Sequence, residues 1–231
     1  MKGTMPRFYY VANWLLPKAM RVMRVTLQVN GIERVPTSGP LLIVSNHVSV
    51  LDPPLVGYAM PRDVVFMSKI ENFQGGRFYA WLVRNYGAFP VRRGDVDLSA
   101  IKQALQILKE ERALFVAPEG TRHSDGVLGE AQHGVAMLAA RADAVILPLG
   151  LHGGHHAEQR MKRWQPIAMT MNIGHPFRLR LPEGRARRDY YPAITDAIME
   201  QVAQLLPAEY RGRFPALTEA QRFIRDDTGA L

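Results

Sequence analysis

The stretch Ser45-Asn46-His47-Val48-Ser49-Val50-Leu51-Asp52 directly follows the apolar run Pro40-Leu41-Leu42-Ile43-Val44. The apolar run is short and begins after Gly39, which predicts a buried β-strand. Pro53 and Pro54 come next, and prolines are tolerated in the first turn of a helix. His47 and Asp52 are therefore predicted to lie on the loop at the carboxyl end of a strand, where open α/β sheets bind their ligands.

The pairing of His47 with Asp52 suggests proton transfer. A carboxylate that accepts a hydrogen bond from one ring nitrogen fixes the imidazole tautomer and leaves the other nitrogen able to take a proton. The alternative is that Asp52 only caps the following helix and that His47 is a polar loop residue. This loop alone does not decide between the two interpretations.

Length and composition indicate one globular domain. The chain has 231 residues, of which 47% are hydrophobic and 22% are charged. It contains no cysteine, which excludes a disulfide framework and a thiolate metal site and fits a reducing compartment. The net charge of +8 favours an anionic partner, such as phospholipid headgroups, nucleic acid or a phosphorylated substrate.

Residues 1–29 are predicted to associate with a membrane surface. The uncharged run from Phe8 to Pro17 is well short of the roughly 20 residues that span a bilayer. Aromatic residues beside basic residues at helical spacing are typical of a helix in the membrane interface. Pro17 is expected to kink this segment or divide it into two short helices. The alternatives are a helix packed on its own domain and a signal peptide, although no small-residue cleavage site is evident.

Strands and helices alternate along the rest of the chain. Further strands are predicted at 26–29, 63–68, 113–117, 144–150 and 167–173, and helices at 55–60, 76–83, from Asp97, from Gly129 and at 194–206. The helix at 76–83 carries three aromatic residues, which suit either the core or a second membrane-facing surface. We expect an α/β domain over residues 30–215, with a mostly parallel or mixed sheet flanked by helices, and a C-terminal tail at 216–231.

Two further loops carry polar groups. The segment Gly87-Ala88-Phe89-Pro90-Val91-Arg92-Arg93-Gly94 ends in two arginines, whose planar donors suit phosphate oxygens, although paired arginines are usually solvated. The segment Pro118-Glu119-Gly120-Thr121-Arg122 follows the predicted strand at 113–117. Gly120 lets a ligand approach the backbone, and the neighbouring side chains supply donors and an acceptor. The alternative for this segment is a glycine turn with surface charges.

Four segments in this order resemble the blocks of the glycerolipid acyltransferases. They are His47-x4-Asp52, Gly87 to Arg93, Pro118 to Arg122 and Val145-Ile146-Leu147-Pro148-Leu149, and the likeness spans residues 45–150. This family comprises 1-acylglycerol-3-phosphate acyltransferases and glycerol-3-phosphate acyltransferases. The resemblance implies that His47 is the catalytic base, that Asp52 orients it and that Arg93 binds the acceptor phosphate. Glu119, Gly120, Thr121 and Arg122 would surround the acceptor glycerol phosphate. Arg92, Ala117 and His123 differ from the residues that the family usually has at these positions.

The resemblance also implies the reaction. An acyl chain would move from acyl-CoA or acyl-carrier protein to the sn-2 hydroxyl of lysophosphatidic acid, forming phosphatidic acid at the cytoplasmic face of the membrane. The enzyme would be peripheral or monotopic, would need no cofactor beyond the thioester, and would form no covalent intermediate. The lack of cysteine and of a Gly-x-Ser-x-Gly motif agrees with this last point.

Other functions stay open. These are transfer to another hydroxylated lipid, a thioesterase, and a non-catalytic membrane-surface module, which would not explain His47 beside Asp52. Nucleic-acid binding would explain only the charge, so no nucleic-acid partner is expected. A loop with His152, His155 and His156 raises the question of a metal, but no companion carboxylate pattern is present and no metal is predicted.

Overall fold

A computed structural model describes residues 4–92, 97–123, 125–181 and 187–226. The strands are β1 (Val25–Asn30), β2 (Leu41–Ser45), β3 (Val64–Lys69), β4 (Ala88–Val91), β5 (Ala113–Val116), β6 (Val145–His152), β7 (Ile167–Ile173), β8 (Phe177–Leu179) and β9 (Ile224–Asp226). The helices are α1 (Arg7–Val22), α2 (Asp52–Ala59), α3 (Glu71–Gln74), α4 (Arg77–Asn85), α5 (Leu98–Lys109), α6 (Gly134–Ala142), α7 (Ala157–Lys162) and α8 (Tyr191–Ala203). Short 3₁₀ helices are η1 (Ile32–Arg34), η2 (Arg187–Tyr190), η3 (Ala208–Tyr210) and η4 (Glu219–Phe223).

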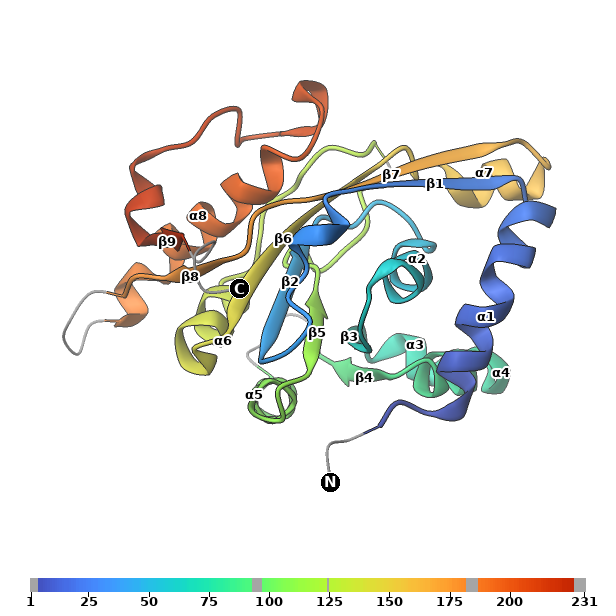
Figure 1. Cartoon of the computed structure of the whole chain (residues 1–231), viewed down its shortest axis with the longest axis horizontal. Helices are drawn as coiled ribbons and strands as arrows, with labels where there is room; N and C mark the ends of the chain where they lie inside the picture. The colour runs from blue at the N-terminus through green and yellow to red at the C-terminus, as the bar shows by residue number, and fades with distance from the viewer. Residues whose placement is uncertain (1–3, 93–96, 124, 182–186, 227–231) are drawn as a thin grey trace.

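The strands of the described residues form one mixed sheet in the order β1-β7-β6-β2-β5-β3-β4, with β8 paired to β6 and to β9 (Figure 1). Strand β2 lies in the middle and is parallel to both β5 and β6, with Ile43 opposite Phe115 and Leu147. Its five residues are all buried, which explains why the first four are apolar without alternation. Because parallel strands end at the same edge of a sheet, the loops after β2, β5 and β6 lie together.

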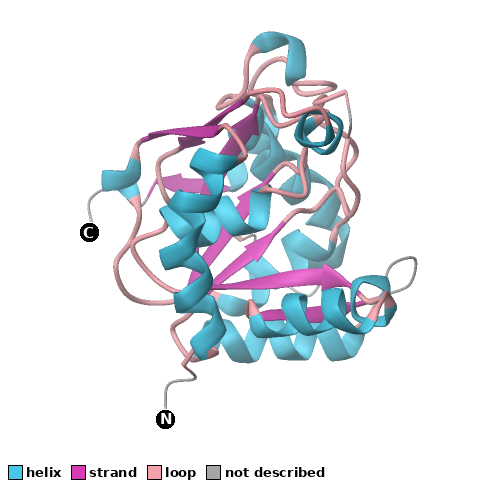
Figure 2. Ribbon diagram, turned by 90° about the vertical axis from the view of Figure 1, so that its right-hand side faces the viewer, coloured by secondary structure: helices cyan, strands magenta, loops and turns pink. Residues whose placement is uncertain are grey.

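Helices cover the sheet, as Figures 1 and 2 show. Asp97 caps α5 as predicted, and its carboxylate accepts hydrogen bonds from the amides of Ser99 and Ala100. The α/β class with a mostly parallel sheet and flanking helices is thus confirmed. Helix α6 begins at Gly134, later than the predicted start at Gly129, because the backbone amides of Gly129 and Gln132 bond to Glu119 and Pro118 instead.

Helix α1 runs unbroken from Arg7 to Val22, so the expected division at Pro17 is wrong. Proline cannot donate to the carbonyl of Asn13, but residues on both sides of it pack on the domain. Tyr9 is buried, and Leu16 and Met20 pack against the core. In the part of the chain that the structure describes, no helix is long and apolar enough to cross a membrane.

The segment after Pro215 has no assignment from sequence, and the structure packs residues 218–226 on the domain. The buried Glu200 of α8 accepts hydrogen bonds from the amide and hydroxyl of Thr218 and from Gln221. Phe223 is buried, and β9 pairs with β8 in antiparallel register. This part of the predicted tail therefore extends the sheet.

Candidate active site

The side chains of His47 and Asp52 meet at the carboxyl end of β2. The Nδ1 atom of His47 lies 2.7 Å from Oδ2 of Asp52. Because a carboxylate only accepts hydrogen bonds, the proton of the neutral ring belongs on Nδ1, which leaves Nε2 as the acceptor. The carboxylate is fully buried, whereas 20% of the His47 side chain is exposed. This is the arrangement that a general base requires.

Asp52 also holds the loop that carries His47. Its Oδ2 accepts hydrogen bonds from the amides of Val48 and Ser49, each at 2.9 Å. Asp52 is the first residue of α2 and makes no cap of its own helix, so the helix-cap interpretation does not describe it. Its other oxygen, Oδ1, is buried with no hydrogen-bond partner among the described residues.

Glu119 ties the loop after β5 to the loop after β2. Its Oε1 accepts the amide hydrogen of His47 at 2.8 Å, and its Oε2 accepts that of Gly129 at 2.8 Å. His123 pairs with Oε2 at 3.3 Å, and its amide donates to the carbonyl of His47 at 3.0 Å. Burial raises the pKa of Glu119. The hydrogen bonds from the two amides, and the charges of His123 and His47, oppose this shift. With both oxygens occupied, Glu119 positions the backbone of His47.

The remaining candidates have different surroundings. Gly120 has a φ of 68°, a conformation that favours glycine, and Thr121 beside it is exposed. The guanidinium of Arg122 forms an ion pair with Glu158 of α7 at the surface. Arg93 lies outside the described residues. The structure thus brings Glu119 against His47, while Arg122 faces α7.

Asn46 is a functional candidate that the sequence did not single out. Its buried side-chain amide donates to the carbonyl of Leu151 and accepts from the amide of the same residue, both at 2.8 Å. Asn46 therefore fastens the start of the His47 loop to β6. A buried bidentate asparagine and a solvated loop asparagine look alike in sequence, so only the topology could reveal it.

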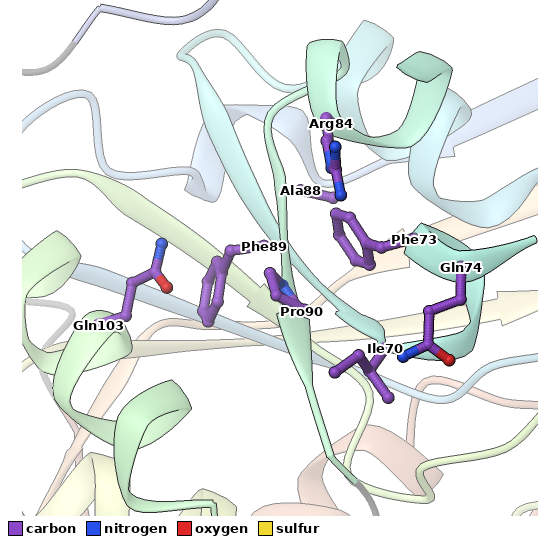
Figure 3. Close-up of a pocket in the computed structure, with 8 residues that line it drawn as sticks. All are labelled: Ile70, Phe73, Gln74, Arg84, Ala88, Phe89, Pro90 and Gln103. Atoms are coloured by element: carbon purple, nitrogen blue, oxygen red, sulfur yellow. The ribbon is translucent and has the colours of Figure 1, made fainter. Parts of the chain in front are cut away.

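A cavity of about 470 Å³ lies at the outer strand β4 (Figure 3). Ile70, Phe73, Phe89 and Pro90 line it, and the guanidinium of Arg84 lies 5.9 Å from the centre of the Phe73 ring. Ala88, Phe89 and Pro90 of the second family segment line it, whereas His47, Asp52 and residues 119–122 do not. The cavity therefore does not help to locate the reaction.

The histidine loop after β6 shows packing contacts. The His155 ring lies 5.5 Å from the ring of His156 and 5.7 Å from that of Tyr210. Burial lowers the pKa values of His152 and His155. Within the described ranges, no three His, Asp or Glu side chains are grouped so that they could hold a metal ion.

Comparisons with known proteins agree with the geometry. The acyltransferase family model matches residues 26–152. A 1-acyl-sn-glycerol-3-phosphate acyltransferase of Streptococcus pneumoniae is 34% identical over 58% of this chain and 49% of its own length, so the chain spans about half of that relative. One of Bacillus subtilis is 25% identical over 86% of this chain and 96% of its own length.

Two further relatives differ in what they contribute. A lyso-ornithine lipid O-acyltransferase of Pseudomonas aeruginosa is 32% identical over 61% of this chain and 53% of its own length. The crystal structure of the 1-acyl-sn-glycerophosphate acyltransferase PlsC from Thermotoga maritima has a TM-score of 0.59 and 22% identity. It covers 81% of this chain and 76% of the PlsC chain, which shows a shared fold.

Proposed function

Because the chain belongs to the acyltransferase family, we propose that it transfers an acyl chain from an acyl thioester to the sn-2 hydroxyl of lysophosphatidic acid, forming phosphatidic acid. The donor is acyl-CoA or acyl-carrier protein. The observation that carries the proposal is the contact of 2.7 Å between His47 Nδ1 and the buried carboxylate of Asp52.

In this mechanism Nε2 of His47 takes the proton of the acceptor hydroxyl as that oxygen attacks the thioester carbonyl. General-base assistance of this kind contributes about 10²–10⁴-fold to a rate. Asp52 stabilises the imidazolium that forms, as the acid does in hydrolase triads. When the tetrahedral intermediate collapses, the carbon–sulfur bond breaks and the imidazolium returns its proton to the leaving thiolate. The nucleophile is the substrate's own hydroxyl, so the enzyme needs no serine or cysteine nucleophile.

Substrate binding is assigned to Arg93 and to residues 120–122. We propose that Arg122 and Arg93 bind the acceptor phosphate and that Gly120 and Thr121 border the glycerol. For Arg122 this requires the phosphate to displace Glu158, which forms an exposed ion pair of the kind that contributes little stability. Glu119 contributes by holding the His47 backbone.

The division of the chain is part of the same proposal. Residues 1–29 would be the interfacial segment, residues 30–215 the acyltransferase domain and residues 216–231 the C-terminal segment. The protein would lie on the cytoplasmic face of the membrane. The positive net charge of +8 supports contact with anionic lipids.

A second candidate is transfer to a different lysolipid, and the similarity to a lyso-ornithine lipid O-acyltransferase supports it. Purified protein with acyl-CoA is tested against lysophosphatidic acid, lyso-ornithine lipid and no acceptor, with free thiol as the readout. The proposal expects fastest thiol release with lysophosphatidic acid. Equal release without any acceptor would indicate a thioesterase instead, and a clear preference for lyso-ornithine lipid would establish the second candidate.

A further inference from the structure

Helix α4 presents a row of large aromatic side chains to solvent. Phe78 is 74% exposed, Trp81 is 48% exposed and Tyr79 is 43% exposed. The sequence left open whether these rings form part of the core. Their exposure shows that they are not part of the core. Aromatic side chains of this size are normally buried, so a cluster of exposed ones needs an explanation. A function outside the core must account for them.

Helix α1 exposes a similar face next to α4. Trp14 is 67% exposed, and Tyr10, Val11 and Leu15 are each more than 40% exposed. The Phe8 ring of α1 lies 4.9 Å from the ring of Trp81, and the Phe78 ring stacks on Trp81 at 6.2 Å. The two helices lie side by side (Figure 1). We call the exposed surface formed by these residues the aromatic platform: Tyr10, Val11, Trp14, Leu15, Phe78, Tyr79 and Trp81.

The charged side chains of the two platform helices are all basic. Helices α1 and α4 contain Arg7, Lys18, Arg21, Arg77 and Arg84 and no acidic residue. The ammonium of Lys18 lies 4.3 Å from the centre of the Trp14 ring. Acidic residues lie nearby as well. Asp63 accepts a hydrogen bond from the hydroxyl of Tyr10, and the exposed Glu71 begins α3, which packs on α4. Aromatic rings edged by cations match the interface of a bilayer that contains anionic lipids.

Buried and partly buried hydrogen bonds fasten both helices to α2, the helix that begins with Asp52. The hydroxyl of Tyr86, directly after α4, donates to Asn13 Oδ1 at 2.6 Å and lies 3.2 Å from the carbonyl oxygen of Pro54. The side chains of Asn13 and Tyr9 donate to the carbonyl of Gly57 at 3.2 and 3.1 Å. Burial raises the pKa of Tyr86, so its hydroxyl remains a donor.

Gly57 permits this close packing. A Cβ atom at that position would lie 2.5 Å from the hydroxyl oxygen of Tyr86, so any larger residue would push Tyr86 away from α2. The platform is therefore held in one orientation relative to the helix that supplies the catalytic carboxylate.

We propose that α1 and α4 together form the surface that docks on an anionic phospholipid bilayer, and that the Tyr86–Asn13 contact fixes this surface relative to α2. The proposal adds α4 to the interfacial segment at 1–29 and extends the proposed function, whose substrates are lipids. Docking through two helices fixes the orientation of the protein on the membrane. With contact through α1 alone, the whole protein could still rotate about the axis of that helix.

The test measures binding to vesicles without any acyl donor, so the result does not depend on the proposed reaction. Phe78→Ser removes the most exposed ring of α4, and Leu217→Ser makes a similar change at a 52% exposed residue outside α1 and α4. With phosphatidylcholine vesicles that contain phosphatidylglycerol, Phe78→Ser should weaken binding about tenfold and Leu217→Ser should leave it unchanged. Omitting phosphatidylglycerol should weaken binding of every variant. Unchanged binding of Phe78→Ser would overturn the proposal.

Tryptophan fluorescence gives a second, independent measurement. The chain has three tryptophans, at positions 14, 81 and 164, so variants that retain only Trp14 or only Trp81 report on α1 and α4 separately. Both should be quenched by vesicles whose acyl chains carry bromine. Quenching of Trp14 without quenching of Trp81 would exclude α4 from the bilayer. A dimer in sedimentation that Phe78→Ser abolishes would instead assign α4 to a second copy of the chain.

Discussion

The substitution Asp52→Asn tests the proposed role of the buried carboxylate. In the folded protein, Oδ2 of Asp52 accepts hydrogen bonds from His47 Nδ1 and from the amides of Val48 and Ser49. An asparagine oxygen can occupy the same place and accept the same three hydrogen atoms. The loop can therefore keep its shape while the negative charge beside the ring is lost.

The size of the expected effect follows from the distance. Opposite charges 2.7 Å apart attract each other by about 6 kcal/mol at an effective dielectric constant of about 20. Part of this attraction is already felt by the neutral ring, so we expect the loss in transition-state stabilisation to be about 3–5 kcal/mol, or about 10²–10⁴-fold in kcat. The new amide nitrogen would replace Oδ1, which is buried without a partner among the described residues, so folding stability should also fall by about 1–3 kcal/mol.

The assay follows thiol release from acyl-CoA with saturating lysophosphatidic acid, at a temperature well below the melting temperature of the variant. Asp226→Asn, at an exposed position on β9, is the matched control and should keep the rate of the unsubstituted protein. If Asp52→Asn is folded and its kcat stays within a few-fold of the unsubstituted rate, Asp52 does not stabilise a charge on His47 and the reasoning fails.

Three further predictions concern Arg122, Glu119 and Asp97. Arg122→Ala should raise the KM for lysophosphatidic acid about tenfold, with little change in the KM for the thioester. The control Glu158→Gln frees Arg122 and should not raise the KM for lysophosphatidic acid. Equal changes in both KM values for Arg122→Ala would count against phosphate binding at this residue. In Glu119→Gln, the side chain can accept a hydrogen bond from the amide of His47 or of Gly129 but not from both, so kcat should fall about tenfold. The exposed control Glu130→Gln should stay active. A fully active Glu119→Gln would show that the hydrogen bonds of Glu119 to both loops are dispensable. Asp97→Ala should lower the free energy of unfolding by about 1 kcal/mol at neutral pH. Because hydrogen bonds lower the pKa of Asp97 from 3.8 to about 2, this difference should persist above pH 3.8 and vanish as the pH falls through about 2; a difference independent of pH would contradict the assignment.

The architecture was largely predictable from sequence because the central strands are buried on both faces. The runs at 41–44, 113–117 and 145–149, which begin β2, β5 and β6, are continuously apolar, and each is followed by a polar residue, proline or glycine. The cap at Asp97 has a local signature, since its carboxylate bonds amides two and three residues later. Boundaries that depend on distant partners were not predictable, as at Gly129, whose amide bonds to Glu119.

The candidate site was predictable where its groups are neighbours in sequence. His47 and Asp52 share one loop, so their contact could be expected. The roles of Glu119 and Asn46 depend on which strands lie beside β2, and no local pattern encodes that order. Likewise, the ion pair of Arg122 with Glu158 joins segments that only the folded chain brings together.

The most direct test of the account is the rate of thiol release by His47→Ala with acyl-CoA and lysophosphatidic acid. His47 contributes little to the core, because its ring is partly exposed, so the variant should fold normally and melt close to the unsubstituted protein. The account predicts that acceptor-dependent release falls about 10²–10⁴-fold, the share of catalysis that a general base supplies. Release at the rate of the unsubstituted protein would contradict it.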